Sequence, residues 1–320
     1  MKEITDYSKV FNTLVEKTKD YIVNSNLKAM ILGISGGIDS TVCAAICHEV
    51  SRRTGIPLIG RSLPTKHNKE GETTAADLVG TAFCTDYKVF NMDLSYRKFA
   101  YDITFSEGLI DTSSLFDFDK KLPKQTDLAN GNIQARLRMI YLYNLASIHR
   151  GLVIDTDNLT ENNLGYFTIH GDVGDFNPIG CLWKTEVFKL AEWLSKEYRK
   201  TPENSEEFES SYNKQTAILS SIYLKPTAGL GITDSDLDEI GAESYEQVDN
   251  ILQEILAWKW LSLEKRGYKY ESVKEMRDAF LEEQAMYCYP IEVIIAVTDK
   301  HFNSEFKRKQ LPIKITRDEI

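Results

Sequence analysis

In the first half of the chain, short apolar runs alternate with segments whose apolar residues recur every three or four positions. The run from Ala29 to Leu32 is short and continuous, as expected of a strand buried on both faces of a sheet. Strands that alternate with helices predict a parallel sheet covered on both faces, and therefore an α/β fold. The predicted strands are 28–35, 56–63, 87–92 and 151–155, and the predicted helices are 8–25, 39–51 and 69–84.

The second half of the chain is predicted to be mainly helical. Two polar segments, 106–130 and 201–225, lack clear periodicity, and at their length we expect lids or ordered insertions rather than passive connections. Both are poor in glycine and proline, which argues against flexible linkers between domains. The predicted helices are 184–197, 245–264, 273–283 and 291–301.

Segment 132–149 has almost no polar face. A helix of this kind is expected to be buried on all sides, either in the core or in a subunit interface. Arg136 and Arg138 interrupt it, and an unpaired buried guanidinium is costly, so each is expected to need an anionic partner. A ligand phosphate or a carboxylate at a dimer interface would supply one.

Composition narrows the class of protein. Of the 320 residues, 42% are hydrophobic, which suits a globular core. No run approaches the roughly 18 apolar residues of a membrane span. Residues 1–9 do not resemble a signal peptide, so we expect a cytoplasmic protein with no membrane partner. The formal net charge of −10 opposes binding to nucleic acid, so local cations and backbone N–H groups must bind any phosphate.

The cysteines form no Cys-x-x-C pair. Cys43 and Cys47 have a spacing that could share a metal ion on one helix, but no second pair completes such a site. Burial as small apolar side chains is the favoured interpretation. The five cysteines are Cys43, Cys47, Cys84, Cys181 and Cys288.

A glycine-rich loop between the first predicted strand and its helix carries the clearest chemical signal. Its sequence is Ser-Gly-Gly-Ile-Asp-Ser over residues 35–40. Gly36 and Gly37 allow consecutive N–H groups to face one anion, and the following helix adds its positive end. Asp39 is placed to hold Mg²⁺ against phosphates. The loop is neither a Walker A nor a Rossmann motif, and its lack of lysine suits reaction at the α-phosphate with release of pyrophosphate.

This loop resembles that of the PP-loop ATP pyrophosphatases, and further segments are similar to those of NAD synthetases within that superfamily. They occur in the family's order from about residue 8 to 312. The similar segments are 131–139 (GNIQARLRM), 156–161 (TDNLTE), 165–168 (GYFT), 171–175 (GDVGD), 182–185 (LWKT), 226–230 (PTAGL) and 304–308 (SEFKR), followed by Pro312.

The resemblance implies both a fold and a reaction. The fold is a single domain over residues 1–320 with a doubly wound parallel sheet of about five strands, like that of adenine nucleotide alpha hydrolases. Its nucleotide-binding part covers about 8–200 and its helical part about 226–312. The reaction is ATP-dependent amidation of deamido-NAD (nicotinic acid adenine dinucleotide) by ammonia, which gives NAD, AMP and pyrophosphate. An acyl adenylate is needed because a carboxylate and ammonia form a salt rather than an amide.

Positions that match the family's motifs carry implied roles. Mg²⁺ is the implied cofactor and ATP the co-substrate, and the partner is a second copy of the chain. Free ammonia or a separate glutaminase would supply the nitrogen. The implied catalytic residues are Asp39, Lys184 and Asp172; ATP contacts are Gly33, Ile34, Ser35, Gly36, Gly37, Ile38, Asp39, Ser40, Arg61, Thr156, Lys184 and Thr227; deamido-NAD contacts are Arg136, His170, Asp175, Phe306 and Lys307; metal ligands are Asp39 and Glu161.

Four positions depart from the family's pattern, all on the acceptor side. Phe306 stands in place of a histidine, Ile169 in place of a lysine, and Asp155 and Val173 in place of glycines. We interpret these departures as a different set of contacts with the same dinucleotide rather than as a sign of a new substrate.

Simpler roles remain open for some residues. Lys184 could be a surface lysine at a helix start, and Glu161 and Asp172 could be loop-capping groups. For the whole chain, the alternatives are another PP-loop ligase acting on a different carboxylate or on tRNA, and a non-catalytic nucleotide-binding protein. The charge of −10 and the absence of a basic stripe argue against tRNA.

Overall fold

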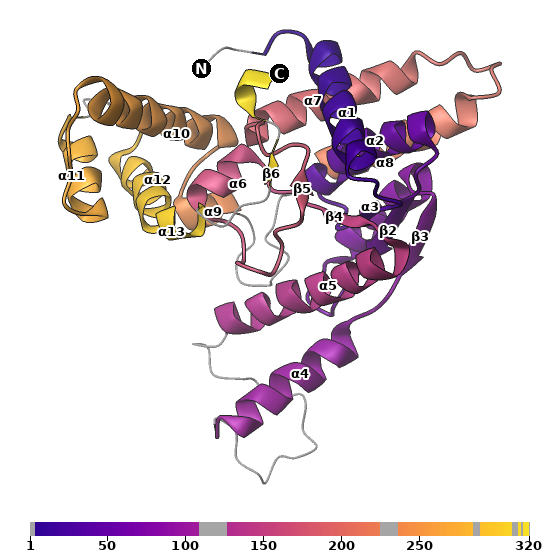
Figure 1. Ribbon diagram of the computed structural model, residues 1–320, viewed down its shortest axis with the longest axis horizontal. Coiled ribbons are helices and arrows are strands. Elements are labelled where there is room, and N and C mark those ends of the chain that lie inside the picture. The colour runs from indigo at the N-terminus through magenta and orange to yellow at the C-terminus, as the bar shows by residue number, and fades with distance from the viewer. Residues whose placement is uncertain are drawn as a thin grey trace.

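The computed structural model describes residues 4–108, 127–224, 236–283, 289–308, 313–314 and 316–319. Within these residues it contains a six-stranded sheet in the order β3-β2-β1-β4-β5-β6, with every pairing parallel (Figure 1). The predicted parallel α/β sheet is therefore confirmed. Two short strands at one edge, β5 and β6, were not predicted. The strands are β1 (Met30–Gly33), β2 (Leu58–Ser62), β3 (Asp86–Val89), β4 (Leu152–Ile154), β5 (Phe176–Asn177) and β6 (Ile313–Lys314).

Helices follow most strands, at the positions that the hydrophobic periodicity predicts. The predicted helix 245–264 begins at Tyr245 but continues beyond Lys259 as a π-helix, Trp260–Lys265. The helices in the described residues are α1 (Tyr7–Asn24), α2 (Ile38–Thr54), α3 (Glu70–Phe83), α4 (Asp93–Ser106), α5 (Asp127–His149), α6 (Leu159–Leu164), α7 (Lys184–Arg199), α8 (Phe208–Ile222), α9 (Asp236–Ile240), α10 (Tyr245–Lys259), α11 (Val273–Glu283), α12 (Ile291–Asn303) and α13 (Glu305–Arg308).

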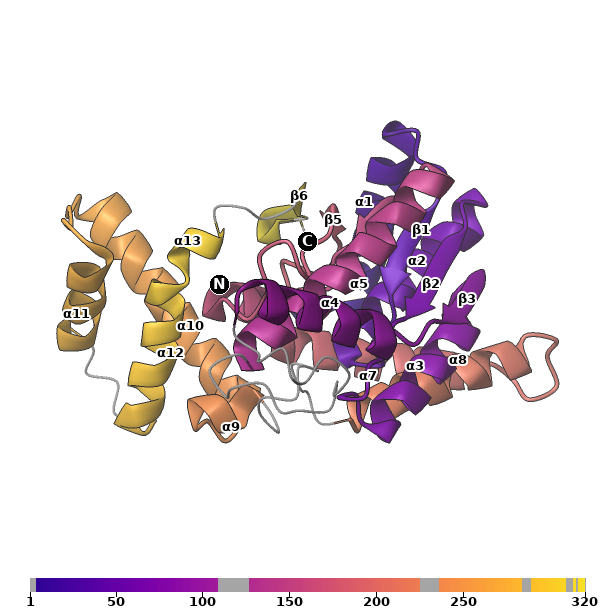
Figure 2. The same cartoon turned by 90° about the horizontal axis from the view of Figure 1, so that it is seen from below.

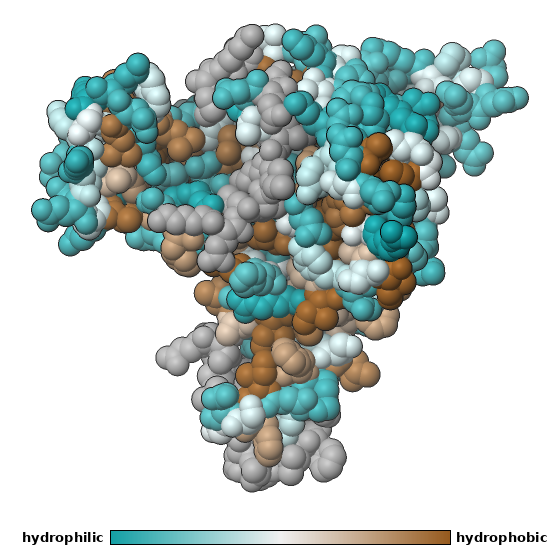
Figure 3. All heavy atoms as spheres, in the orientation of Figure 1, coloured by the Kyte–Doolittle hydropathy of each residue, from teal (hydrophilic) through white to brown (hydrophobic). Residues whose placement is uncertain are grey.

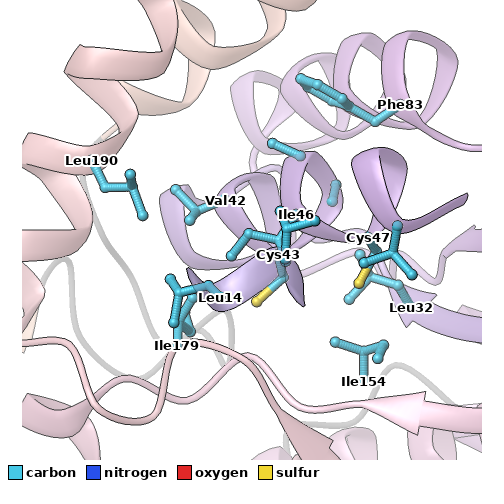
Figure 4. Packing of buried hydrophobic residues seen from close by; sticks show 14 of the residues in the cluster. Leu14, Leu32, Val42, Cys43, Ile46, Cys47, Phe83, Ile154, Ile179 and Leu190 are labelled. Atoms are coloured by element: carbon cyan, nitrogen blue, oxygen red, sulfur yellow. The ribbon is translucent and has the colours of Figure 1, made fainter. Parts of the chain in front are cut away.

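Alternate residues of the central strands face opposite layers of helices. Met30 and Leu32 of β1 pack into a cluster with α1, α2, α3, α7 and α8, whereas Ile31 packs against α5. Because side chains alternate along a strand, a sheet made of continuous apolar runs is buried on both faces. This confirms the doubly wound arrangement. Figure 4 shows Cys43 and Cys47 among apolar side chains of the first cluster, and both are fully buried, as predicted.

The later helices form a second core. Ile251 and Leu252 of α10 pack with Phe280 of α11 and Val297 of α12. Figures 1 and 2 show α9 to α13 gathered on the side of the molecule away from β1, β2 and β3. Trp183 and Leu164, from the segments around α6 and α7, belong to the same cluster, so this core joins the helices to the sheet part of the chain.

The two polar segments have different outcomes. Segment 201–225 contains α8, whose buried residues Ala217 and Ile218 pack in the first core against α7 and α3. An ordered insertion is therefore the alternative that the structure supports for this segment. The other segment, 106–130, lies largely outside the described residues.

Within the single chain, segment 132–149 is not buried on all sides, so the alternative of a core helix is wrong. Met139, Leu142 and Ala146 of α5 face the sheet, but Ile140 and Ile148 are 63% and 64% exposed. The exposed face also carries polar residues, among them Arg136, Asn144 and Ser147, but the apolar residues between them suggested complete burial. Of the two alternatives for this helix, its exposed face fits a subunit interface.

Candidate functional site

The candidate site lies at the carboxyl ends of β1 and β4. These neighbouring strands mark the point where the order of the sheet reverses, because the chain moves outward from β1 to β2 and β3 and then returns to β4. Open parallel sheets bind ligands outside the carboxyl ends of their strands at such a point. The glycine-rich loop 35–40 follows β1, and segment 156–161 follows β4. The topology thus brings together two motifs that are more than 110 residues apart in the sequence.

Gly36 shapes the glycine-rich loop. Its φ angle is +85°, and a Cβ atom at this position would lie only 2.4 Å from the backbone oxygen of Glu72 in α3. Both the left-handed backbone and this close approach require glycine. The Ser35 and Ser40 hydroxyls lie 3.0 Å apart across the loop, and the Gly37 N–H donates to Ser35 Oγ at 3.2 Å. The hydroxyls therefore line the inside of the turn.

The start of α2 is open to an anion. Gly37 is the N-cap residue and provides no side-chain hydrogen bond to the first turn. The first N–H groups of a helix lack partners within the helix and carry a partial positive charge. A phosphate group beside Ile38, Asp39 and Ser40 would satisfy them.

Lys184 links the two motifs. Its Nζ atom donates to Asp39 Oδ2 at 2.5 Å and to Glu161 Oε1 at 2.9 Å, and the side chain is 2% exposed. Burial opposes the charge on Lys184, but the Asp39 and Glu161 carboxylates outweigh it and raise its pKa well above the usual value. Lys184 is therefore a buried cation, and the alternative of an ordinary surface lysine is wrong.

Glu161 also caps α6, which confirms the simpler role of a capping group. Its Oε2 accepts from Asn158 N at 3.3 Å, and Asn158 Oδ1 accepts from Glu161 N at 3.0 Å, which forms a capping box. Asn158 Nδ2 in turn donates to Asp39 Oδ1 at 2.9 Å. The capping role and contact with Lys184 use different oxygens of Glu161, so one does not exclude the other. Sequence analysis did not select Asn158, although its place three residues before Glu161 is the signature of the box.

Asp39 and Glu161 converge closely enough to bind one cation. Each has an oxygen within 3 Å of the same nitrogen, so a small ion at that position would have a carboxylate ligand from each motif. Two carboxylates with room for phosphate oxygens and water form a suitable ligand set for Mg²⁺. In the present arrangement the Lys184 ammonium supplies the positive charge. No group of three or more His, Cys, Asp or Glu residues that could hold a metal is found among the described residues.

The other predicted ATP contacts differ in their surroundings. Arg61 in β2 is 3% exposed, and its guanidinium donates to Asp86 Oδ2 at 2.7 Å, on the side of β3. Thr156 lies two residues after the end of β4. This strand pairs with β1, and the glycine-rich loop follows β1. Thr227 and segment 226–230 lie outside the described residues. The roles of all three residues in ATP binding remain predictions.

Asp172 lies in the loop that precedes β5. Thr168 N donates to its Oδ1 at 2.6 Å. Asp172 is exposed as a residue, but its carboxylate accepts from the loop backbone and the surrounding protein limits its hydration. This loss of hydration, together with the Asp155 carboxylate, raises the pKa of Asp172 to about 7, although Thr168, Lys307 and Arg138 act in the opposite direction.

Asp155, one of the departures, is fully buried and fixes the same loop. Its Oδ2 accepts from Gly174 N at 3.0 Å, and its Oδ1 accepts from Asp157 N at 2.7 Å and from Asn177 Nδ2 at 2.9 Å. A Cβ at position 174 would lie 2.7 Å from Asp155 N, so the glycine there permits this approach. The carboxylate thus ties β4 to the loop that carries Asp172.

The two arginines of α5 lie in different surroundings. Arg136 is exposed in the single chain and donates through Nε to Ile169 O at 3.3 Å, and its anionic partner stays a prediction. Arg138 is largely buried and donates to Leu63 O at 3.0 Å and to Asn68 Oδ1 at 3.2 Å. Burial lowers its pKa, whereas the charges of the Glu72 and Asp172 carboxylates oppose that change, and a directly paired anion for Arg138 stays a prediction.

The C-terminal candidate residues meet the loop 165–170. Lys307 Nζ donates to Gly165 O and to Phe167 O, both at 2.7 Å. Phe306 beside it is 60% exposed. His170 has a φ of +60° and is also exposed. Lys307 is therefore bound to the loop, whereas Phe306 and His170 face solvent.

Asp175 borders a cavity of about 540 Å³ near the amino ends of β1 and β4. Its Oδ1 accepts from Tyr143 OH at 3.0 Å, and its Oδ2 accepts from Val153 N at 2.9 Å. Asn26 and Arg150 line the same cavity, and both have positive φ angles, 53° and 54°. The candidate residues for deamido-NAD therefore do not lie at one end of the sheet. They extend along β4, from the carboxyl ends of the strands to the amino ends.

Comparisons with known proteins agree with this arrangement. A family model described as NAD synthase matches residues 10–310. The chain is 31% identical over 251 residues to an NH(3)-dependent NAD(+) synthetase of Thermoplasma volcanium, covering 78% of this chain and 85% of the relative. It is 32% identical over 249 residues to one of Finegoldia magna, covering 77% and 85%.

Two solved structures share the fold. NMN synthetase from Francisella tularensis is 23% identical with a TM-score of 0.66, covering 97% of this chain and 99% of that chain. NH3-dependent NAD synthetase from Campylobacter jejuni is 21% identical with a TM-score of 0.57, covering 98% and 100%. Within the described residues, no helix has both the length and the apolar character needed to span a membrane.

Proposed function

This chain belongs to the NAD synthase family, and we propose that it makes NAD from deamido-NAD, ATP and ammonia by way of an acyl adenylate. The observation that carries the proposal is the convergence of Lys184, Asp39 and Glu161 beside the glycine-rich loop. Nucleotide binding alone would not require a buried cation there. Transfer at the α-phosphorus does, because negative charge develops on the departing pyrophosphate.

In the first step, the carboxylate of deamido-NAD attacks the α-phosphorus of ATP and pyrophosphate leaves. The loop N–H groups and the start of α2 hold the departing phosphates. Lys184, placed at the same end of the sheet, neutralises charge that grows on the bridging and terminal oxygens. Most of the rate acceleration then comes from positioning and from charge stabilisation, as in other phosphoryl and nucleotidyl transfers.

Asp39 and Glu161 would hold Mg²⁺ during this step. When bound, the ion would neutralise phosphate charge and orient the pyrophosphate for departure. Lys184 would then leave the two carboxylates for the phosphates, which remain within reach of its long side chain. The paired carboxylates support this assignment, since Lys184 already occupies the position of a cation between them.

In the second step, ammonia attacks the acyl carbon and AMP leaves. Ammonia in neutral water is mostly ammonium, so it must lose a proton near the acyl group. Asp172 suits this role because its raised pKa of about 7 makes it a better proton acceptor than an ordinary carboxylate. The same group attracts the ammonium ion before transfer.

The acceptor is proposed to lie along the loop 165–175. Its nicotinate end would sit near Lys307 and Asp172, close to the ATP site. Its adenosine end would reach Asp175 and the cavity beside Tyr143.

A homodimer is part of the proposal. The outer surfaces of α4 and α5 expose large apolar side chains, which soluble monomers rarely gather in one area. Figure 3 shows apolar side chains on the lower part of the molecule, where Figure 1 places α4 and α5. These residues are Leu94, Phe99, Ile103, Phe105, Leu128, Ile140, Tyr143 and Ile148.

The central experiment is an acceptor assay. The purified chain is incubated with ATP, Mg²⁺, ammonium and deamido-NAD, and NAD, AMP and pyrophosphate are measured. A parallel reaction uses nicotinic acid mononucleotide, the acid that corresponds to NMN, because one of the similar structures is an NMN synthetase. We expect equal amounts of NAD, AMP and pyrophosphate with the dinucleotide and ammonium alone. AMP release with another acid but not with deamido-NAD would refute the proposal.

A further inference from the structure

Asp249 of α10 contacts both segments that carry the candidate ATP-site residues. It is 2% exposed. Its Oδ1 accepts from Thr160 Oγ1 at 2.5 Å, and its Oδ2 accepts from Thr185 N at 3.1 Å and from Thr185 Oγ1 at 2.8 Å. Thr160 immediately precedes Glu161, and Thr185 immediately follows Lys184. One carboxylate from the helical part of the chain therefore joins the start of α6 to the start of α7.

The hydrogen bonds around Thr160 have a fixed direction. Lys184 N donates to Thr160 Oγ1 at 2.8 Å, so this oxygen acts as an acceptor there. The single hydroxyl proton of Thr160 is then free to donate to Asp249, which when ionised only accepts. Burial raises the pKa of Asp249 to about 6, while the bonds from Thr160 and Thr185 act against this rise, so the group is ionised at pH 8. The chain of bonds runs from Lys184 through Thr160 to Asp249.

The same carboxylate caps α7 from outside. Trp183, the N-cap residue, makes no side-chain hydrogen bond to the helix, and the first N–H groups of a helix need partners. Asp249 serves Thr185 directly and Lys184 through Thr160. A negative charge at this end of the helix is also favourable for its dipole.

Tyr245 provides a second contact from the same helix. It lies four residues before Asp249, and its ring centroid is 5.5 Å from Lys184 Nζ. Residues four apart share one face of a helix. The first turn of α10 therefore supports Lys184 at its backbone, through Asp249, and at its ammonium, through the face of Tyr245.

We propose that Asp249 is a positioning residue that sets Lys184 and Glu161 against the glycine-rich loop. It acts through Thr160 and Thr185 and touches no substrate. Apolar contacts could join these helices at a lower cost in free energy than a buried carboxylate. The presence of Asp249 is therefore explained by the two segments that it holds in place. The proposal rests on the proposed function only in assigning Lys184 to ATP.

The test compares D249N with S244A. An asparagine at position 249 keeps the size but removes the negative charge and one of the two acceptor oxygens. Thr160 or Thr185 must then accept from an N–H₂ group instead of donating to a carboxylate, which weakens the hold on both segments. Ser244 caps α10 by accepting from Gln247 N, and S244A removes that bond while leaving the contacts of Tyr245 and Asp249 in place. Exchange of pyrophosphate into ATP, driven by deamido-NAD without ammonia, reports adenylation. We expect D249N to lower the maximal exchange rate about 100-fold, with the KM for deamido-NAD unchanged. S244A lowers the Tm but keeps the rate within about twofold of wild type.

Two outcomes would overturn the proposal: a D249N rate like that of S244A, or a D249N rate that falls only in proportion to its Tm. If D249N does not fold, T160V removes the bridging hydroxyl at almost constant volume, and the same loss of exchange is expected. Unchanged exchange in T160V would then refute the proposed chain of bonds.

A separate readout distinguishes this proposal from the proposed function. The rise in Tm produced by Mg·ATP alone requires no acceptor. We expect it in wild type and in S244A but reduced in D249N. If wild type shows the ATP-dependent rise yet makes no NAD, the reaction assignment fails while the positioning role is still tested. An ATP-dependent rise that is equal in all three proteins contradicts the positioning role.

Discussion

At the scale of single residues, Lys184 is expected to contribute most to both stability and activity. Replacement by methionine keeps the side-chain volume but leaves the Asp39 and Glu161 carboxylates facing each other without a cation. Because removal of one partner from a buried ion pair leaves uncompensated charge, we expect K184M to lose about 3 kcal/mol of unfolding free energy. Pyrophosphate exchange should fall at least about 100-fold.

Mg²⁺ gives this prediction a second measurement. If Asp39 and Glu161 share a metal position, the ion replaces the missing ammonium, and the Tm of K184M rises with Mg²⁺ more than that of wild type. K189M is the matched control, since Lys189 is an exposed lysine of the same helix. A K184M protein that is insensitive to Mg²⁺ would contradict the metal assignment.

The raised pKa of Asp172 predicts the pH dependence of the amidation step. The carboxylate must be ionised to accept a proton from ammonium, so activity should rise as pH increases through about 7, the folded-state pKa. Rates must be compared at equal concentrations of free ammonia, because that concentration also rises with pH. In D172N we expect this acid limb to disappear and the rate with ammonia to fall, while adenylation persists. An unchanged limb in D172N would assign it to another group.

Local motifs indicated some of these residues, and only the fold revealed others. The glycine-rich loop and Glu161 were found because each lies in a short pattern with a physical reason for its spacing. The partners of Arg138, Asn158 and Asp249 lie in segments up to 119 residues away in the sequence, and no local pattern records such contacts. The exposed position of Arg136 was also hidden, because α5 has apolar residues on its outer face.

At the scale of elements, strands β1 to β4 and most of the long helices followed from periodicity. Among the helices that were not predicted, the two long ones, α4 and α8, were missed for different reasons. The inner face of α8 has one large apolar residue, Ile218, and is otherwise made of small residues such as Ala217 and Ser221, where larger apolar residues would give a signal. In α4, Leu94 and Phe99 are exposed, so its apolar residues do not form a single buried stripe. The strands β5 and β6 contain only two residues each, which is too short for any pattern.

The outer face of α5 leads to a prediction about assembly. Ile140 is 63% exposed in the single chain, so I140D should leave the fold of the protomer intact, whereas a charge in an apolar interface prevents association. We expect wild type to sediment as a dimer and I140D as a monomer with a similar circular dichroism spectrum. V23D on α1 is the control, because Val23 is 49% exposed on a different helix and should leave the dimer intact. A monomeric wild type would contradict the assignment of this face.

At the scale of the whole molecule, the sheet part and the helical part share a core. Trp183 and Leu164 lie before residue 200, yet they pack with Val248, Ile251 and Phe280. Asp249 adds buried hydrogen bonds across the same junction. Separation of the two parts would expose this apolar surface and leave a buried carboxylate without donors, so the core of the helical part is incomplete without residues of the sheet part.

We therefore expect the chain to unfold as one cooperative unit, in keeping with the single domain predicted over residues 1–320. Tryptophan fluorescence, which reports on Trp183 and Trp258 in the shared core, should change at the same temperature as the far-ultraviolet circular dichroism of all helices. A fragment of residues 1–200 should fail to fold, because Trp183 and Leu164 would face water. Two separate transitions, or a stable fragment that still binds ATP, would show instead that the helical part is an independent domain. In that case α10 would support Lys184 only while the two domains are docked, and conditions that separate them would abolish adenylation before the sheet unfolds.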